Sequence, residues 1–331
     1  MAGQLFTVNS LGGFYASFNL SKELREGVQA TSKFRQFADI KDAWGKVTRT
    51  GQTFTWDTVP MLTRASRALL ETNTIGQGSH TILQGTLTMN ERGFSIPYTQ
   101  MLESLSMVSV RQPIMRVLKY DAAVDLDCLA HQQFNDTPLR VVSTSSGDTA
   151  FTLTTNSTAT ATNTSILSKI NVRAIVDGMK GRNIPYYSEG DAYYCISRPA
   201  GLRVLKNDIE AVHQYTETGL AAIKKGEIGR YEDCKFVEQT TIPTGGAADS
   251  TTFDEFTDTG DAWNTAGAGD WAFFLGEDTV CEAIETMEEI RAKIPDDYGR
   301  SRGIAWYALL GYGITHTNVT QARILKFDSA V

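Results

Sequence analysis

Two stretches in the first third of the chain alternate between hydrophobic and polar residues. One covers residues 53–56 and the other residues 81–89, and Gly76 and Gly78 lie in the polar segment between them. Strict alternation predicts strands, and glycine among polar residues predicts a loop tip. We therefore expect a long two-stranded hairpin. Because an isolated hairpin is marginally stable in water, this one should lie on another surface, such as a neighbouring subunit.

The strongest helical pattern covers residues 111–134, with Pro113 suited to its first turn. Asp121 and Asp125, four residues apart, project onto the apolar stripe and are expected to anchor backbone amides or arginines rather than to perform acid–base chemistry. The remaining members of the stripe share helical spacing and are expected to face inward: Ile114, Val117, Leu118, Ala122, Leu126, Cys128 and Leu129.

The rest of the chain mixes short helical and strand patterns. Before the hairpin, an arm with one short helix is expected, capped by Ser21 and carrying Leu24, Val28, Phe34 and Phe37 on its apolar face. After the long helix, the pattern predicts a hairpin in 137–165, helices at 166–179 and 199–206, strands at 191–197, 235–238 and 271–275, and β structure over 302–326. The inward positions of the 166–179 helix are Ile166, Ile170, Ala174, Ile175 and Met179. This mixture indicates an α+β chain with interleaved subdomains.

Charge is distributed unevenly along the chain. Its net value is −7, yet residues 31–70 carry seven Lys or Arg against three Asp, whereas acids dominate residues 231–297. The basic segment, with Lys33, Arg35 and Lys41, could face a polyanion, although ordinary solvated faces explain it equally well. No apolar run approaches the roughly 20 residues of a membrane span, and the first 20 residues do not resemble a signal peptide.

Motifs for catalysis, metals and cofactors are weak. Four scattered cysteines (128, 195, 234 and 281) and four dispersed histidines predict neither a disulfide framework nor a metal site. Ser301, in Gly299-Arg300-Ser301-Arg302-Gly303, fits the nucleophile-elbow formula, but no core strand precedes it and Asp328 follows His316 in the wrong order. The segment 226–230 has two glycines but precedes a strand, so a tight turn is expected there rather than a phosphate site. No catalytic residue, metal ligand or cofactor is predicted.

Five blocks of the sequence stand out together: Gly226-Glu227-Ile228-Gly229-Arg230 with Phe236-Val237-Glu238, Val124-Asp125-Leu126-Asp127-Cys128-Leu129, Tyr194-Cys195-Ile196-Ser197-Arg198-Pro199, residues 271–276, and Arg323-Ile324-Leu325. In their order, they resemble blocks of the major capsid proteins of tailed bacteriophages with the Hong Kong 97-like fold. The match is most similar to the branch found in podophages related to coliphage N-four. It spans roughly residues 50–327.

The resemblance implies an architecture of four parts. These are an N-arm (1–49), an extended E-loop (50–98), a peripheral domain with a long spine helix (99–137 and 306–331) and an axial domain (138–305). It implies a structural, non-enzymatic subunit that forms hexamers and pentamers in an icosahedral shell around double-stranded DNA. The virion capsid would be assembled in the host cytoplasm with a portal protein, a separate scaffolding protein and possible decoration proteins, without a membrane.

The resemblance also directs attention to particular charged residues. Arg64, Arg67 and Arg92, the arginines of the E-loop, are expected to donate salt bridges to a neighbouring subunit, and Lys33, Arg35 and Lys41 are expected to face DNA. Some relatives crosslink subunits through an E-loop lysine, but this chain has no lysine between Lys46 and Lys119. We therefore predict a shell without E-loop isopeptide bonds.

Three other functions stay open at this stage. An encapsulin-like shell of a cellular nanocompartment would share the fold but enclose an enzyme instead of DNA. A β-rich, tail-associated phage protein would stay monomeric or form small rings. A hydrolase using Ser301 is the remaining option from the enzyme class.

Overall fold

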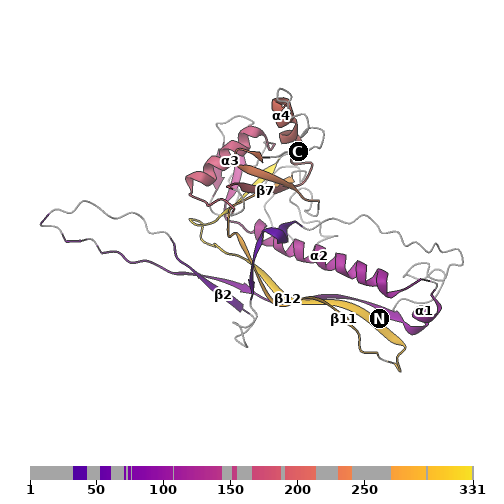
Figure 1. Ribbon diagram of the computed structural model, residues 1–331. Coiled ribbons are helices and arrows are strands. Elements are labelled where there is room, and N and C mark those ends of the chain that lie inside the picture. Colours follow the sequence, from indigo (N-terminus) through magenta and orange to yellow (C-terminus); the bar gives the residue numbers. More distant parts are fainter. Residues whose placement is uncertain are drawn as a thin grey trace.

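The computed structural model describes residues 33–42, 53–60, 71, 74–75, 77–106, 108–143, 151–154, 166–187, 191–213, 230–240, 270–295 and 297–329. In this part of the chain, helices and strands form two sheet-based bodies and one protruding hairpin (Figure 1). The expectations for the arm helix before Lys33, for Gly226–Gly229 and for the acidic segment 241–269 lie outside the described residues. Phe34–Phe37, expected within that helix, forms a short 3-10 turn, η1.

The first body is a four-stranded sheet covered on one face by a long helix. Its strand order is β1-β11-β12-β4, with β1 parallel to β11 and the other pairs antiparallel. The strands are Ala38–Asp42, Val280–Ala292, Ser301–Ile314 and Asn90–Thr99. The short helix α1 (Gln100–Leu105) follows β4, and its first turn is capped by the Thr99 hydroxyl, which accepts a hydrogen bond from the Leu102 N–H.

Helix α2 (Arg111–Asn135) confirms the strongest sequence pattern. Ile114, Leu118, Ala122 and Leu126 are buried against the sheet, as predicted. Val117 is 50% exposed, so its expected inward position was wrong. At 100° per residue it lies about 90° or more from the centre of the buried stripe, and the sheet covers only one side of the helix.

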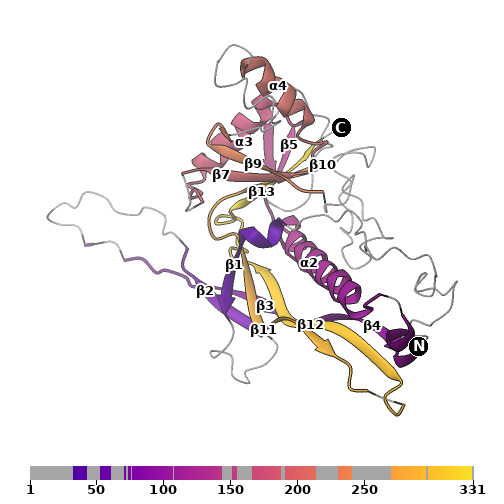
Figure 2. The ribbon, with the colours of Figure 1, turned by 45° about the vertical axis from the view of Figure 1, so that its right-hand side comes forward.

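The second body is a seven-stranded mixed sheet with order β6-β5-β13-β10-β7-β9-β8. Its strands are Phe151–Thr154, Arg140–Ser143, Ile324–Ser329, Asp270–Leu275, Tyr193–Ser197, Cys234–Glu238 and Arg230–Tyr231. Helices α3 (Lys169–Gly181) and α4 (Arg203–His213) accompany it (Figure 2). The strands expected at 191–197, 235–238 and 271–275 and the hairpin within 137–165 are confirmed.

Both helices of this body begin later than expected. α3 starts after Ser168, whose hydroxyl caps the Asn171 N–H, and this start leaves Ile166 outside the helix and 36% exposed instead of inward. α4 starts at Arg203 rather than at Pro199, because residues 199–202 form turns. Val172, Ile175 and Met179 of α3 are fully buried in the second core.

The sheets divide the chain differently from the predicted domain bounds. β11 and the start of β12 lie in the sheet under α2, although residues up to 305 were assigned to the axial domain. β13, assigned to the peripheral domain, lies inside the seven-stranded sheet between β5 and β10. Backbone pairing between distant segments decides both placements, and local sequence does not encode it.

The hairpin of β2 (Thr53–Thr58) and β3 (Leu83–Thr88) packs on the first body at its base, where Leu87 is buried beside Cys281 and Ala283 of β11, and its other end protrudes from that body (Figure 1). Its strands pair antiparallel in the register Thr53↔Thr88 to Thr58↔Leu83, which confirms the hairpin predicted from the alternating pattern. Along β2 every second residue is exposed, and Val59 and Ile82 remain 65% and 56% exposed at the end of the pairing. This extended element has little core of its own.

Candidate functional site

The short segment Lys33–Asp42, which we call the arm segment, is held across α2 and along the edge of the four-stranded sheet. Its strand β1 pairs with β11 from Ala38↔Val280 to Asp42↔Ile284. Phe34 is only 1% exposed, and its ring centroid lies 5.0 Å from that of His131, 5.5 Å from Phe134 and 5.7 Å from Phe273. The arm segment therefore packs on both α2 and the second sheet.

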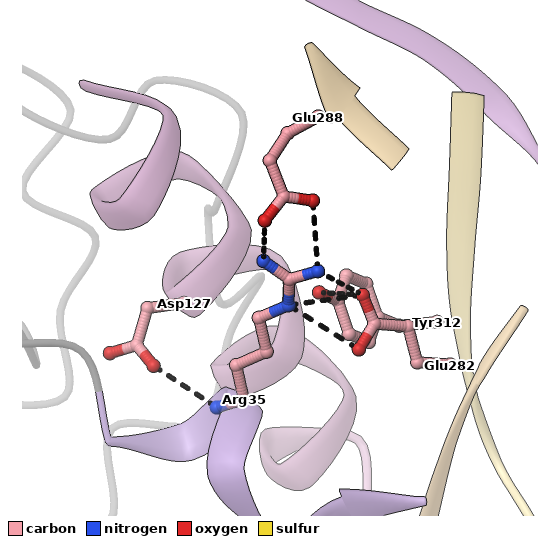
Figure 3. A network of polar contacts seen from close by, with 5 residues as sticks. All are labelled: Arg35, Asp127, Glu282, Glu288 and Tyr312. Carbon is pink, nitrogen blue, oxygen red and sulfur yellow. Dashed lines mark hydrogen bonds and ion pairs between the residues drawn. The ribbon is translucent and has the colours of Figure 1, made fainter. Parts of the chain in front are cut away.

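Asp127 of α2 fixes the backbone at the start of the arm segment (Figure 3). Its Oδ1 accepts hydrogen bonds from the backbone N–H of Lys33 at 2.9 Å and of Arg35 at 3.1 Å, and its Oδ2 accepts one from Gln239 Nε2 at 2.5 Å. Burial raises the pKa of Asp127 above its ordinary value, and these hydrogen bonds oppose the rise. Asp127 thus acts for the arm segment much as a capping residue acts for a helix.

Arg35 is clamped by two carboxylates of β11 (Figure 3). Its Nη2 lies 3.0 Å from Glu282 Oε1, and its Nη1 lies 2.8 Å from Glu288 Oε1. Glu282 is fully buried and also accepts a hydrogen bond from the Tyr312 hydroxyl at 2.9 Å. Arg35 in turn lowers the pKa of Glu288 by hydrogen bonding to it, while burial and then Glu282 raise the pKa of Tyr312.

Together these residues form the arm anchor: Arg35, Asp127, Gln239, Glu282, Glu288 and Tyr312. They come from five separate parts of the chain, and Gln239 follows β9 of the second body. A buried ion pair adds little net stability. Removing one of its partners is nevertheless costly, because the charge of the other partner is left buried and uncompensated. The arm anchor is therefore suited to enforcing one path for the arm segment and to holding the two bodies together beneath it.

A second cluster fixes the base of the hairpin on the first sheet. Trp56 Nε1 donates to the Thr315 carbonyl at 2.9 Å, and its ring occupies space left by two glycines. A Cβ on Gly85 would lie 2.4 Å from Trp56 Cε2, and one on Gly313 would lie 3.2 Å from Trp56 Cη2. The indole therefore determines how the hairpin leaves the body.

The residues predicted to bridge subunits are only partly described. Arg64 and Arg67 lie outside the described residues. Arg92, on β4, lies 3.9 Å from Asp125 of α2, both side chains being about a quarter exposed. Asp121 accepts a hydrogen bond from Trp306 Nε1 at 2.8 Å. The two acids predicted from their spacing thus meet an arginine and an indole.

The residues predicted to face DNA take different positions. The guanidinium of Arg35 is engaged by Glu282 and Glu288 within the chain, so its charge is compensated there rather than presented outward as expected. Lys33 is half-buried at the start of the arm segment, with its backbone on Asp127. Lys41 lies on β1, and its side chain is outside the described part.

The serine elbow has no catalytic geometry. Ser301 is the first residue of β12, whereas His316 follows the far end of the same strand and pairs with Asp278 at 3.1 Å. Ser301 Oγ instead accepts a hydrogen bond from Lys293 Nζ at 2.9 Å. No cluster of three metal-ligating side chains occurs among the described residues, and all four cysteines are free and buried. None of the helices in the described ranges has the length and apolar character to cross a bilayer.

Sequence reasoning missed the central members of the arm anchor: Asp127, Glu282, Glu288 and Tyr312. One local signal was available for Glu282, because it is the single charge within the otherwise apolar run Val280-Cys281-Glu282-Ala283-Ile284. A charge in such a strand needs a buried partner. Nothing in the sequence identifies that partner as Arg35, which lies 247 positions away.

Solved structures with the same fold are capsids of phages and related particles. No protein-family model matches the chain, and no curated protein does. A chain in the capsid of cyanophage P-SCSP1u has 10% identity and a TM-score of 0.68, covering 95% of this chain and 93% of that one. A chain in the acid-stable capsid of Helicobacter pylori bacteriophage KHP30 has 12% identity and a TM-score of 0.69, and the match covers 98% of this chain and 99% of that one. A chain in the capsid of Ralstonia phage GP4 has 14% identity and a TM-score of 0.65, and the match covers 98% of each chain. At these identities the comparisons establish the fold: a mixed α and β chain with the architecture of phage capsid proteins over nearly its whole length.

Proposed function

We propose that this chain is the major capsid protein of a tailed bacteriophage, a structural subunit that assembles into the icosahedral shell around the genome. The observation that carries the proposal is the agreement in fold with three phage capsid chains, which covers at least 95% of this chain and 93% of each of theirs. A fold shared from end to end leaves little of the chain for an unrelated activity. Fold alone does not dictate function, so the subunit's own surfaces matter as well.

Two features of this chain support assembly. The hairpin β2–β3 extends into solvent with exposed Val59 and Ile82, and such an element gains stability by lying on another subunit. At the other end of the first body, Ile294 and Tyr298 at the turn between β11 and β12 are almost fully exposed. Apolar surface at both ends of an elongated body is expected of a subunit that is covered by neighbours.

The finer assignments of the Hong Kong 97-like fold belong to the same proposal. The arm segment corresponds to the end of the N-arm, the β2–β3 hairpin to the E-loop, α2 to the spine helix, and the two sheets to the peripheral and axial domains. Hexamers and pentamers, a separate scaffolding protein, a portal, packaged double-stranded DNA and possible decoration proteins complete the virion, which would be assembled in the host cytoplasm. The branch of podophages related to coliphage N-four is proposed from the sequence blocks alone.

Electron microscopy of the expressed protein, alone and with the products of neighbouring genes, tests the proposal. We expect closed icosahedral shells that contain DNA when all head proteins are present. Shells that enclose an enzyme instead would favour an encapsulin-like nanocompartment. Monomers or small rings under every condition would refute a shell function and favour a tail-associated protein.

A shell of this protein is expected to dissociate completely in denaturant. Lysine is absent between Lys46 and Lys119, so the β2–β3 hairpin has no amine for an isopeptide bond. Denaturing gel electrophoresis of purified particles should give a single band near 36.4 kDa. A ladder of covalent oligomers would contradict the prediction.

A further inference from the structure

A polar groove lies between the base of the β2–β3 hairpin and the C-terminal end of α2. Its volume is about 460 Å³, within the range of ordinary small-molecule sites. The segment from β3 into β4 forms one wall, the last two turns of α2 form the other, and the end of β12 forms the floor. The arm anchor and the hairpin base use none of the wall side chains, so the groove calls for an explanation of its own.

The residues of each wall follow the period of the element that carries them. Those of the strand wall recur at every second position and share one face: Thr86, Thr88, Asn90 and Arg92. Those of the helix wall occur at i, i+3, i+4 and i+7 and share one stripe: Leu129, Gln132, Gln133 and Asp136. Side chains that face one another inside a fold are normally apolar, yet seven of these eight can form hydrogen bonds. Both elements thus keep this space for polar contents.

The lining is close to neutral and rich in groups that both donate and accept hydrogen bonds. The two threonine hydroxyls and the two glutamine amides of the walls have this double capacity. The threonines are exposed and the glutamines half-buried, so all four can meet a ligand. Among the lining residues only Arg92 and Asp136 carry charge, and their charges are opposite. Half-buried Leu129 and Ile314 add apolar surface beside these polar groups.

This lining matches a neutral ligand that carries many hydroxyl groups. A phosphate or nucleotide needs a surplus of positive charge, and the guanidinium of Arg92 already lies 3.9 Å from Asp125. A lipid would leave the wall amides and hydroxyls without hydrogen bonds, which is costly. An extended peptide carries its backbone donors and acceptors along two edges. A sugar ring instead carries hydroxyls around its rim and apolar C–H groups on its faces, and both kinds of group have counterparts in the groove.

We propose that the groove between β3 and α2 binds a saccharide of about disaccharide size, whose ring hydroxyls are bound by the threonines and glutamines of the walls. A cavity of about 150 Å³ accommodates a benzene ring, so about 460 Å³ has room for two larger hexose rings. The strand wall is preformed, because a Cβ on Gly311 would lie 2.5 Å from the Thr88 carbonyl oxygen and its absence lets β3 lie directly against β12. A preformed wall lowers the entropy cost of binding. Saccharide binding of this kind is independent of the proposed shell function.

The test compares two full-length double variants that each lose two exposed threonine hydroxyls. Thr86→Val with Thr88→Val alters the strand wall. Thr53→Val with Thr55→Val is the control, because it alters the paired positions of β2, which are exposed on the same face but lie outside the groove lining. Binding of maltose, lactose and N,N′-diacetylchitobiose is titrated by saturation-transfer-difference NMR. The unmodified protein and the control should bind at least one disaccharide saturably, and the wall variant should bind it roughly tenfold more weakly, since each lost hydrogen bond removes part of the affinity.

A second variant, Gln132→Leu with Gln133→Leu, makes the same test from the helix wall, and thermal unfolding confirms that each variant is folded. Absence of saturable binding to all three disaccharides, or an affinity unchanged in both wall variants, would overturn the proposal. Tighter binding to a bacterial surface polysaccharide than to a free disaccharide would support a glycan as the source of the ligand, and equal affinity would support free sugar.

Electron microscopy of the same proteins keeps saccharide binding apart from the proposed function. Closed shells from an unmodified protein that binds no sugar would overturn the saccharide site alone. Absence of shells from a protein that does bind sugar would count against the shell function alone. Loss of shells from the wall variants, together with no sugar binding by the unmodified protein, would overturn the saccharide site in favour of a second copy of the chain in the groove.

Discussion

Replacing Glu282 with leucine is expected to destabilise the folded subunit by about 3–5 kcal/mol, because it leaves the Arg35 guanidinium and the Tyr312 hydroxyl without their buried partner. For a chain of this length that loss corresponds to a fall in melting temperature of roughly 4–7 °C. Differential scanning calorimetry or thermal circular dichroism measures it. The arm segment should detach first, since Arg35 and β1 both depend on β11.

Two further variants show whether the unpaired charge is the cause. In the double variant Arg35→Met with Glu282→Leu, both charges disappear and most of the lost stability should return, because apolar residues of similar volume replace buried ion pairs at little cost. Glu289→Leu removes a carboxylate of the same strand that is half-exposed and pairs with Arg291, and it should change stability by no more than about 1 kcal/mol. A double variant less stable than the single one would contradict the role given to the arm anchor.

Replacing Trp56 with alanine is expected to abolish shell assembly while leaving the two sheet bodies folded. The half-buried indole fills the space beside Gly85 and Gly313 and donates to the Thr315 carbonyl. Truncation of a large aromatic side chain costs about 3–5 kcal/mol when it is fully buried, so about 2–3 kcal/mol is expected here. Since about 1.4 kcal/mol is a factor of ten, the docked position of the hairpin should become roughly 30- to 140-fold less populated.

Sedimentation and negative-stain microscopy measure shell yield, and thermal unfolding measures the bodies. Trp56→Phe, which keeps a ring but loses the hydrogen bond to Thr315, should give an intermediate yield. Thr55→Ala changes an exposed residue on the opposite face of the same strand and should assemble normally. Normal shells from Trp56→Ala would show that the hairpin base does not limit assembly.

Local pattern was a good guide where one face of an element is buried along its whole length. The stripe through Leu118 and Leu126 and the alternation in 53–58 and 83–88 each repeat the period of their element, so the long helix and the hairpin are readable directly. Strand β11 could not have been predicted from local sequence pattern. Its Glu-, Met- and Ala-containing sequence has no strand-like alternation, yet it pairs with β12 along almost its full length and with β1 on its other edge. Tertiary pairing overrides local preference there.

The carboxylates of α2 show that helical periodicity cannot identify which acid will meet a distant segment. The four-residue spacing of Asp121 and Asp125 drew attention to them, but the anchor of the arm segment is Asp127, two positions later. Helical periodicity states which residues share a face. It does not state that a segment nearly a hundred residues away will cover one face and bring its backbone amides there.

The sequence by itself determined the kind of chain: mixed α and β, with a long helix, an extended hairpin and no catalytic or metal motif. These features depend on residue type and on spacing within a few turns or strands. Only the tertiary structure decided that Arg35 belongs with Glu282 and Glu288, that β13 lies in the second sheet, and that Asp127 lies under the arm segment. Each of these depends on the approach of segments far apart in the chain, and the free energy of such contacts exists only once the two bodies have packed.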